Sequence, residues 1–150
     1  MDRPQQAHET ISVERDLPNC RDQVWSAWSL LAKKRRWFGA GLTEMDFSPG
    51  GIERSSFVND MGTHTNETRY FEIKAKERIV FAYSMAVDGR VHTVSLATVA
   101  FADHGGGTRL TYTEQMCIIP PSDGAEGRRH GWLGLLGALQ DYLADDQRPL

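Results

Sequence analysis

Glu114 is the polar residue of this 150-residue chain whose position best suits a chemical role. It lies in the run 108–118, where alternation of apolar and polar residues places it on one face with Leu110, Tyr112 and Met116. A carboxylate on an apolar inner face is costly unless a cation pairs with it. Such a carboxylate could orient the polar end of a ligand or act as a general acid or base.

Two arginines near the start of the last predicted helix are candidate partners for this carboxylate. Arg128 and Arg129 could pair with Glu114 if the helix packs over the strand. The alternative is that both arginines are surface charges, as most arginines are, and that Glu114 reaches solvent near the end of its strand. The sequence leaves both interpretations open.

The neighbouring run 90–102 indicates room for a ligand. Alternation places six of its residues on one face, namely Val91, Thr93, Ser95, Ala97, Val99 and Phe101. Thr93, Ser95 and Ala97 are small where a filled core would hold leucine or isoleucine. Small side chains on a concave sheet leave volume, which a ligand cavity requires. A β-bulge in either long strand would invert part of this face.

Aromatic side chains are the other candidates for lining a cavity, although each could equally fill the core. Tyr83 and Tyr112 are the better candidates, because a buried phenol needs a hydrogen-bond partner. The full set of predicted ligand-binding residues is Trp37, Phe38, Phe57, Phe71, Tyr83, Met85, Thr93, Ser95, Tyr112, Glu114, Trp132 and Leu136.

The spacing of residues supports neither a metal site nor a nucleophilic catalytic site. The five histidines have no metal-ligand spacing, and no Ser-His-Asp or Cys-His arrangement stands out, so we expect no metal and assign no catalytic residue. The loop 103–107, which contains three consecutive glycines, precedes a strand and not a helix, and this favours a hairpin over a phosphate-binding loop. We therefore expect no cofactor.

Periodicity and turn residues predict the elements that position these side chains. A polar tail over 1–8 should precede a domain over 9–146 that opens with a strand. Val24, Ala27, Trp28 and Leu31 form the inner stripe of a predicted helix over 20–32, and 33–38 should form a short second helix or turn. Strands are predicted at 42–47, 52–58, 63–74, 78–86, 90–102 and 108–118, and a last helix runs from Ser122 or Asp123 to about Ala144.

Charge and composition exclude several classes of partner. The formal net charge of −3 argues against nucleic acid, and Lys33–Arg36 are expected to be a solvated bend between two helices. The polar N-terminus and the absence of a long apolar run predict a cytoplasmic protein without a membrane span. Cys20 and Cys117 fit reduced thiols. Edge strands and exposed aromatic side chains are compatible with a homodimer.

Several short motifs, in their order along the chain, resemble those of a known protein family. They are Val24-Trp25-Ser26-Ala27-Trp28, Arg36-Trp37-Phe38-Gly39, Pro49-Gly50-Gly51, Glu77-Arg78-Ile79-Val80-Phe81, Gly106-Gly107-Thr108-Arg109-Leu110-Thr111 and Gly131-Trp132. Together they resemble the helix-grip (START/Bet v-like) fold of the SRPBCC superfamily. Within it the chain is similar to the family named after the C-terminal domain of the activator of heat-shock protein 90 ATPase.

The resemblance implies an α+β fold: a curved antiparallel sheet of about seven strands wrapped around a long C-terminal helix. It also implies a single cavity between sheet and helix. Many members are small bacterial proteins without an assigned role, whereas superfamily relatives bind lipids, sterols or polyketides, and a few are cyclases. We therefore expect binding of a small hydrophobic or amphipathic molecule; the alternatives are a cyclase or dehydratase using the same cavity and a co-chaperone-like activator. A chaperone partner is not expected, because true activators carry a separate N-terminal chaperone-binding domain.

Overall fold

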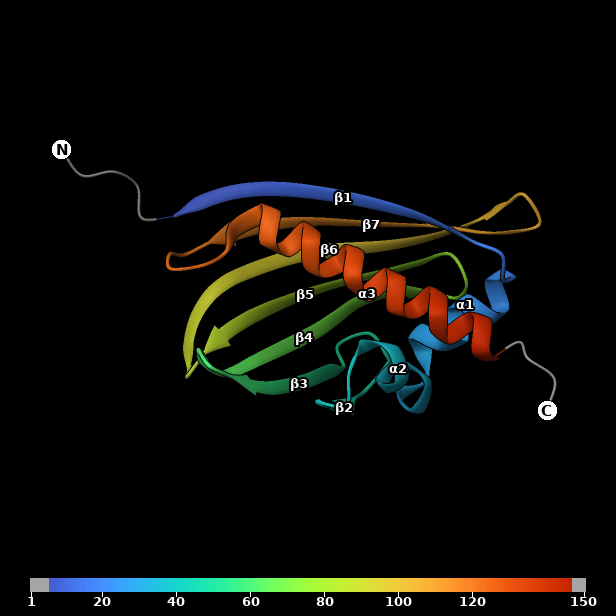
Figure 1. Cartoon of the computed structure of the whole chain (residues 1–150). Coiled ribbons are helices and arrows are strands. Elements are labelled where there is room, and N and C mark those ends of the chain that lie inside the picture. The colour runs from blue at the N-terminus through green and yellow to red at the C-terminus, as the bar shows by residue number, and fades with distance from the viewer. Residues whose placement is uncertain (1–5, 147–150) are drawn as a thin grey trace.

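The computed structural model describes residues 6–146 and has one curved, seven-stranded antiparallel sheet with three helices. The strands lie in the order β1-β7-β6-β5-β4-β3-β2, and the long helix α3 crosses the concave side of the sheet (Figure 1). The predicted α+β helix-grip architecture is therefore confirmed. The strands are β1 (Ala7–Leu17), β2 (Leu42–Met45), β3 (Ile52–Asn59), β4 (Gly62–Lys74), β5 (Arg78–Val87), β6 (Arg90–His104) and β7 (Gly107–Ile118); the helices are α1 (Arg21–Ser29), α2 (Leu31–Phe38) and α3 (Gly124–Asp146).

The first strand begins earlier than the sequence suggests. Ala7 and His8 were expected in a tail, but they pair with Ile118 and Cys117 in the antiparallel β1–β7 ladder. Backbone pairing with a long neighbouring strand orders them although their side chains are exposed. Residues 1–5 of the expected tail lie outside the described residues.

The first helical region breaks at Leu30, and this break changes the role of the basic run. Leu30 has an extended backbone (φ −107°, ψ 123°), so α1 ends at Ser29 and α2 starts at Leu31 in a new direction. Lys34 and Trp37 become the buried residues of α2. The expectation that Lys33–Arg36 is a solvated bend between two helices is therefore wrong: all four residues lie within α2, and Lys34 is only 4% exposed.

A bulge changes the inner face of β6 at one end. Met85 pairs with Thr93 and Ala86 with Val91, so His92 is the extra residue between them. The predicted inward face holds for Thr93, Ser95, Ala97, Val99 and Phe101. Val91, by contrast, is turned outward and His92 is buried in its place.

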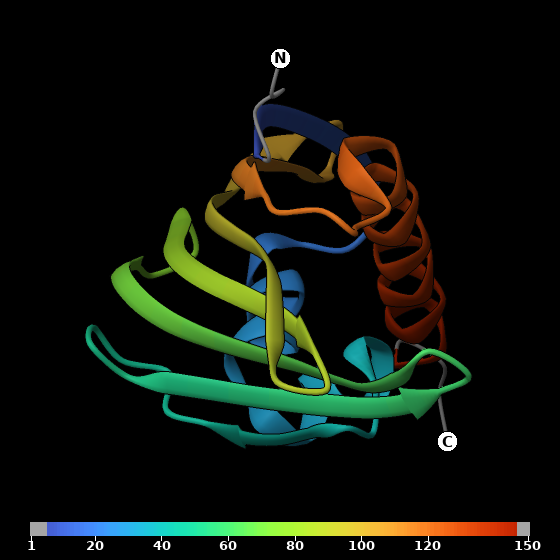
Figure 2. The same cartoon turned by 90° about the vertical axis from the view of Figure 1, so that its left-hand side faces the viewer.

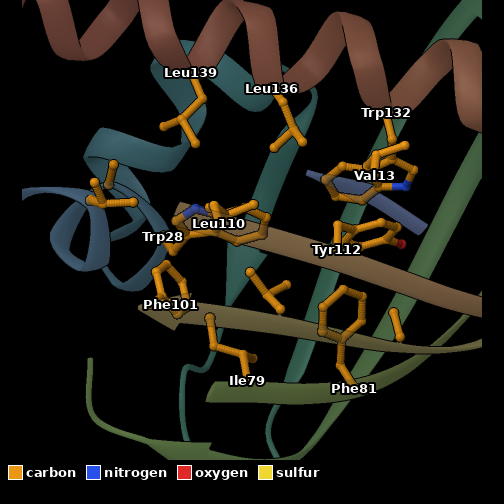
Figure 3. Close-up of a cluster of buried hydrophobic side chains, with 14 of the residues drawn as sticks. Val13, Trp28, Ile79, Phe81, Phe101, Leu110, Tyr112, Trp132, Leu136 and Leu139 are labelled. Carbon is orange, nitrogen blue, oxygen red and sulfur yellow. The ribbon is translucent and has the colours of Figure 1, made fainter. Parts of the chain in front are cut away.

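The core lies between the sheet and the three helices. Trp132 of α3 stacks on Tyr112 of β7, with ring centroids 3.8 Å apart, and Trp28 of α1 packs edge-on against Phe101 of β6 (Figure 3). Leu136 and Leu139 continue this contact along α3. Burial of these large apolar surfaces is the main force that holds α3 against the sheet.

Helix α3 covers only part of the sheet. It packs mainly against β1, α1 and α2, whereas β3, β4 and β5 curve around and away below it (Figure 2). Within residues 6–146 no helix combines the length and apolar character needed to cross a membrane.

A candidate ligand cavity between the sheet and the C-terminal helix

A cavity of about 950 Å³ lies where the sheet curves away from α3. This volume is at the upper end of the range for sites that bind small molecules. The wall is largely apolar, with Phe38 from α2, Phe81 and Met85 from β5, and Trp132 and Leu135 from α3. Such a wall can enclose the apolar body of a ligand.

At the α3 side of the cavity, Glu114 accepts hydrogen bonds from four side chains. The Tyr83 and Tyr112 hydroxyls donate to its Oε1 at 2.6 and 2.5 Å, and the Ser95 hydroxyl donates to its Oε2 at 2.5 Å. The Arg128 guanidinium completes the set by an ion pair with Oε2. Glu114 is fully buried and does not line the cavity. Its carboxylate therefore positions the residues around it.

Arg128 and Tyr83 are the members of this cluster that reach the cavity wall. Within residues 6–146, the hydrogen bonds of Arg128 all come from Nη1, which donates to Glu114 and, at 2.7 Å, to the Tyr83 hydroxyl. Nη1 carries two hydrogens, so both are used. Nε and Nη2 keep three donor hydrogens for an acceptor in the cavity.

Burial shifts the pKa values of the groups around Arg128. Burial, and then the adjacent Glu114 carboxylate, raise the pKa of Tyr83 well above its usual value. The pKa of Tyr112 is raised in the same direction, mainly by burial. His92 also lines the cavity, and burial together with the positive charge of Arg128 lowers its pKa. All three groups are therefore neutral at pH 7, and the two that line the cavity, Tyr83 and His92, face it as uncharged polar groups.

A second buried ion pair lies at the α2 side of the cavity. Lys34 Nζ is 2.7 Å from Glu53 Oε1, and the Tyr70 hydroxyl donates to the same oxygen. The Lys34 ammonium also lies 4.8 Å from the centre of the Phe38 ring and 5.5 Å from that of Trp28. Lys34 and Glu53 both line the cavity.

The structure separates the twelve predicted site residues into three groups. The cavity wall includes Phe38, Phe57, Tyr83, Met85 and Trp132. Beneath the wall, buried in the core or in the Glu114 cluster, lie Trp37, Thr93, Ser95, Tyr112, Glu114 and Leu136. Phe71 is outside the cavity: it is the extra residue of a bulge in β4, 57% exposed, with the Arg69 guanidinium over its ring.

Sequence reasoning missed several polar residues of the wall, among them Lys34, Glu53 and His92. Lys34 and Glu53 stand in a basic run and in a polar strand, where solvent exposure is the ordinary expectation. His92 is turned inward only by the bulge in β6. One signal for Glu53 was available in the sequence. Alternation along β3 places Glu53 on the same face as Ser55 and Phe57, and Phe57 was already a candidate for the site.

Comparison with known proteins identifies the family. Residues 20–144 match the sequence pattern of the family described as activator of Hsp90 ATPase homolog 1-like protein. The chain belongs to this family. The match covers α1 to α3 and thus every element that contributes to the cavity.

Solved structures of similar proteins agree with the assignment to the activator homolog family. An uncharacterised protein from Rhizobium leguminosarum is 32% identical, with 93% of this chain and 97% of that chain covered and a TM-score of 0.89. The Mll3558 protein from Rhizobium loti is 38% identical over 91% of this chain and 98% of that chain, with a TM-score of 0.85. Protein CV1439 from Chromobacterium violaceum, at 24% identity and a TM-score of 0.72, covers 89% of this chain and 96% of its own and shares the fold. No match was found among curated proteins.

Proposed function

We propose that this member of the activator homolog family binds a small amphipathic molecule in the cavity between the sheet and α3. The observation that carries the proposal is the cavity of about 950 Å³ with an apolar wall and a few polar groups at defined places. Ligand sites in proteins combine these two properties, because apolar surface supplies affinity and placed polar groups supply orientation.

The Glu114 cluster supports a binding role for Arg128. A guanidinium held from behind by a carboxylate and a phenol presents its remaining donors in a fixed direction, which favours a carbonyl or other acceptor on the ligand. Glu114 itself does not line the cavity, so the geometry does not support an acid–base role for this residue.

Titration with Nile red, an uncharged dye that fluoresces in apolar surroundings, tests the proposal. The chain offers a matched pair of variants on α3: a side chain added at Gly131 would meet no atom within 4 Å and would enter the cavity, whereas Gly134 is equally open but does not line it. We expect Gly131→Phe to weaken dye binding about tenfold and Gly134→Phe to leave it unchanged. A wild-type protein that binds no dye, or two variants of equal affinity, would overturn the proposal.

A further inference from the structure

The inner face of the sheet carries an unbroken row of polar side chains. Glu53 pairs with Thr68, Thr68 with Tyr83, and Tyr83 with Ser95, so the row crosses four neighbouring strands. All four residues are at most 6% exposed. Tyr83 and Ser95 bond to Glu114, and Thr68 bonds to Asn66, so these members of the row are satisfied within the protein. The polar groups left for a ligand are therefore at Glu53, at one end of the row, and at Arg128, which bonds to Tyr83.

Glu53 has an oxygen that no described residue satisfies. Both of its hydrogen bonds, from Lys34 and from Tyr70, end on Oε1, so within residues 6–146 Oε2 has no donor. The residue is 4% exposed and lines the cavity. Oε2 is therefore an acceptor left for a group in the cavity, as Nε and Nη2 of Arg128 are donors.

The buried charges of the wall are matched in pairs, and its two exposed charged side chains, Arg90 and Asp123, are opposite in sign. Lys34 is balanced by Glu53, and Arg128 is balanced by Glu114 directly behind it. Burial keeps His92 neutral by lowering its pKa. A ligand with a net charge would find no counter-charge left for it between these pairs, which favours an uncharged molecule.

From these contacts we infer that the ligand is an uncharged molecule with two polar ends: a hydroxyl that donates to Glu53 Oε2 and a carbonyl-type acceptor that binds Arg128. The inference rests on the proposed ligand-binding function. Glu53 and Tyr83, the neighbour of Arg128, are two strands apart, which corresponds to about 10 Å between their backbones. The ring of Phe81 lines the wall between the two ends, in contact with Tyr70, the partner of Glu53, and with Tyr83, the partner of Arg128.

Competition against Nile red tests this inference with two uncharged probes that differ in one group. One is a straight-chain methyl ketone with a nonane backbone, and the other is the same ketone with a hydroxyl at its far end. We expect the wild-type protein to bind the hydroxy ketone about tenfold more tightly, because a hydrogen bond to a buried carboxylate is made only by that probe. A variant that changes the whole cavity alters the affinities for both probes alike, so the ratio of the two affinities reports only the contribution of the hydroxyl.

Two variants locate the preference. Glu53→Gln keeps the shape of the side chain but leaves Lys34 without its counter-charge, and this variant could fail to fold. The double variant Lys34→Met/Glu53→Met replaces the ion pair by apolar side chains of similar length and provides a second test. We expect the affinity ratio to fall to about one in the double variant. The inference would be overturned if the wild-type protein bound both ketones equally, or if the preference survived in the double variant; the ligand-binding proposal would still stand in either case. If the wild-type protein did not bind the dye, both proposals would be overturned.

Discussion

Arg128 on α3 and Tyr83 on β5 are joined by a hydrogen bond of 2.7 Å, although 45 residues separate them in the chain. Both also bond to the buried Glu114 carboxylate on β7. The helix and two strands thus meet at a single charged group that water does not reach.

Glu114→Gln should destabilise the fold by about 3 kcal/mol or more, because it leaves the buried Arg128 cation without its counter-charge. Urea unfolding measures the change. The double variant Glu114→Leu/Arg128→Met should recover part of the loss, since both charges are then absent. The control is Asp16→Asn, which breaks the exposed pair with Arg109 and should change stability little. A Glu114→Gln protein as stable as the wild type would contradict the assigned role.

Three of the four tyrosines should not ionise while the protein is folded. Burial raises the pKa values of Tyr70, Tyr83 and Tyr112 above the usual value of about 10. A phenol whose folded pKa is raised contributes stability below its unfolded pKa and loses that contribution as the pH rises further. Burial also raises the pKa of Tyr142, but this side chain is only partly buried. Phenolate absorbance should therefore report Tyr142 as the single titrating tyrosine until far-ultraviolet dichroism shows unfolding above pH 10. Titration of two or more tyrosines in the folded protein would be inconsistent with their burial.

His92 should make the protein sensitive to mild acid. Its folded pKa is lowered by burial and by Arg128, so its contribution to stability is present above the unfolded value of about 6.5 and is lost as the pH falls toward the folded value. The unfolding free energy should decrease between pH 7.5 and pH 5.5 in the wild type. His92→Gln should reduce this decrease, and an unchanged pH dependence in that variant would assign the effect to other groups.

Phe57 and Phe71 form a matched pair for testing the cavity wall. Their exposed fractions are 55% and 57%, but Phe57 lines the cavity and Phe71 does not. Phe57→Ser should weaken Nile red binding several-fold because it removes apolar contact area, whereas Phe71→Ser should leave binding unchanged. The comparison is made by fluorescence titration under identical conditions. Equal loss in both variants would show that the dye binds elsewhere on the surface.

The sequence was sufficient for the order of elements because alternation and turn residues are local signals. Asp88 and Gly89, for example, both have positive φ, as a tight hairpin turn requires. The same alternation placed Glu114 on the inner face. It could not show that Arg128 meets this carboxylate, since that contact depends on how α3 packs over the sheet.

Three other positions depended on irregularities that have no clear sequence signal. Lys34 is buried because the backbone turns at Leu30, where neither glycine nor proline marks a break. His92 is turned inward by a bulge, and a second bulge turns Phe71 outward. Each case involves one residue that departs from regular geometry, and periodicity carries no information about such a residue.

The two buried ion pairs also bear on how a ligand gains access. Lys34 ties α2 to β3 and Arg128 ties α3 to β5, so separating either helix from the sheet would expose an unpaired charge to an apolar surrounding. The β3–β4 hairpin around Asn59 and the segment before α3 around Ser122 contribute to the wall without such a tie. We therefore expect the cavity to open by local motion of these two segments, with the helices remaining as a rigid frame.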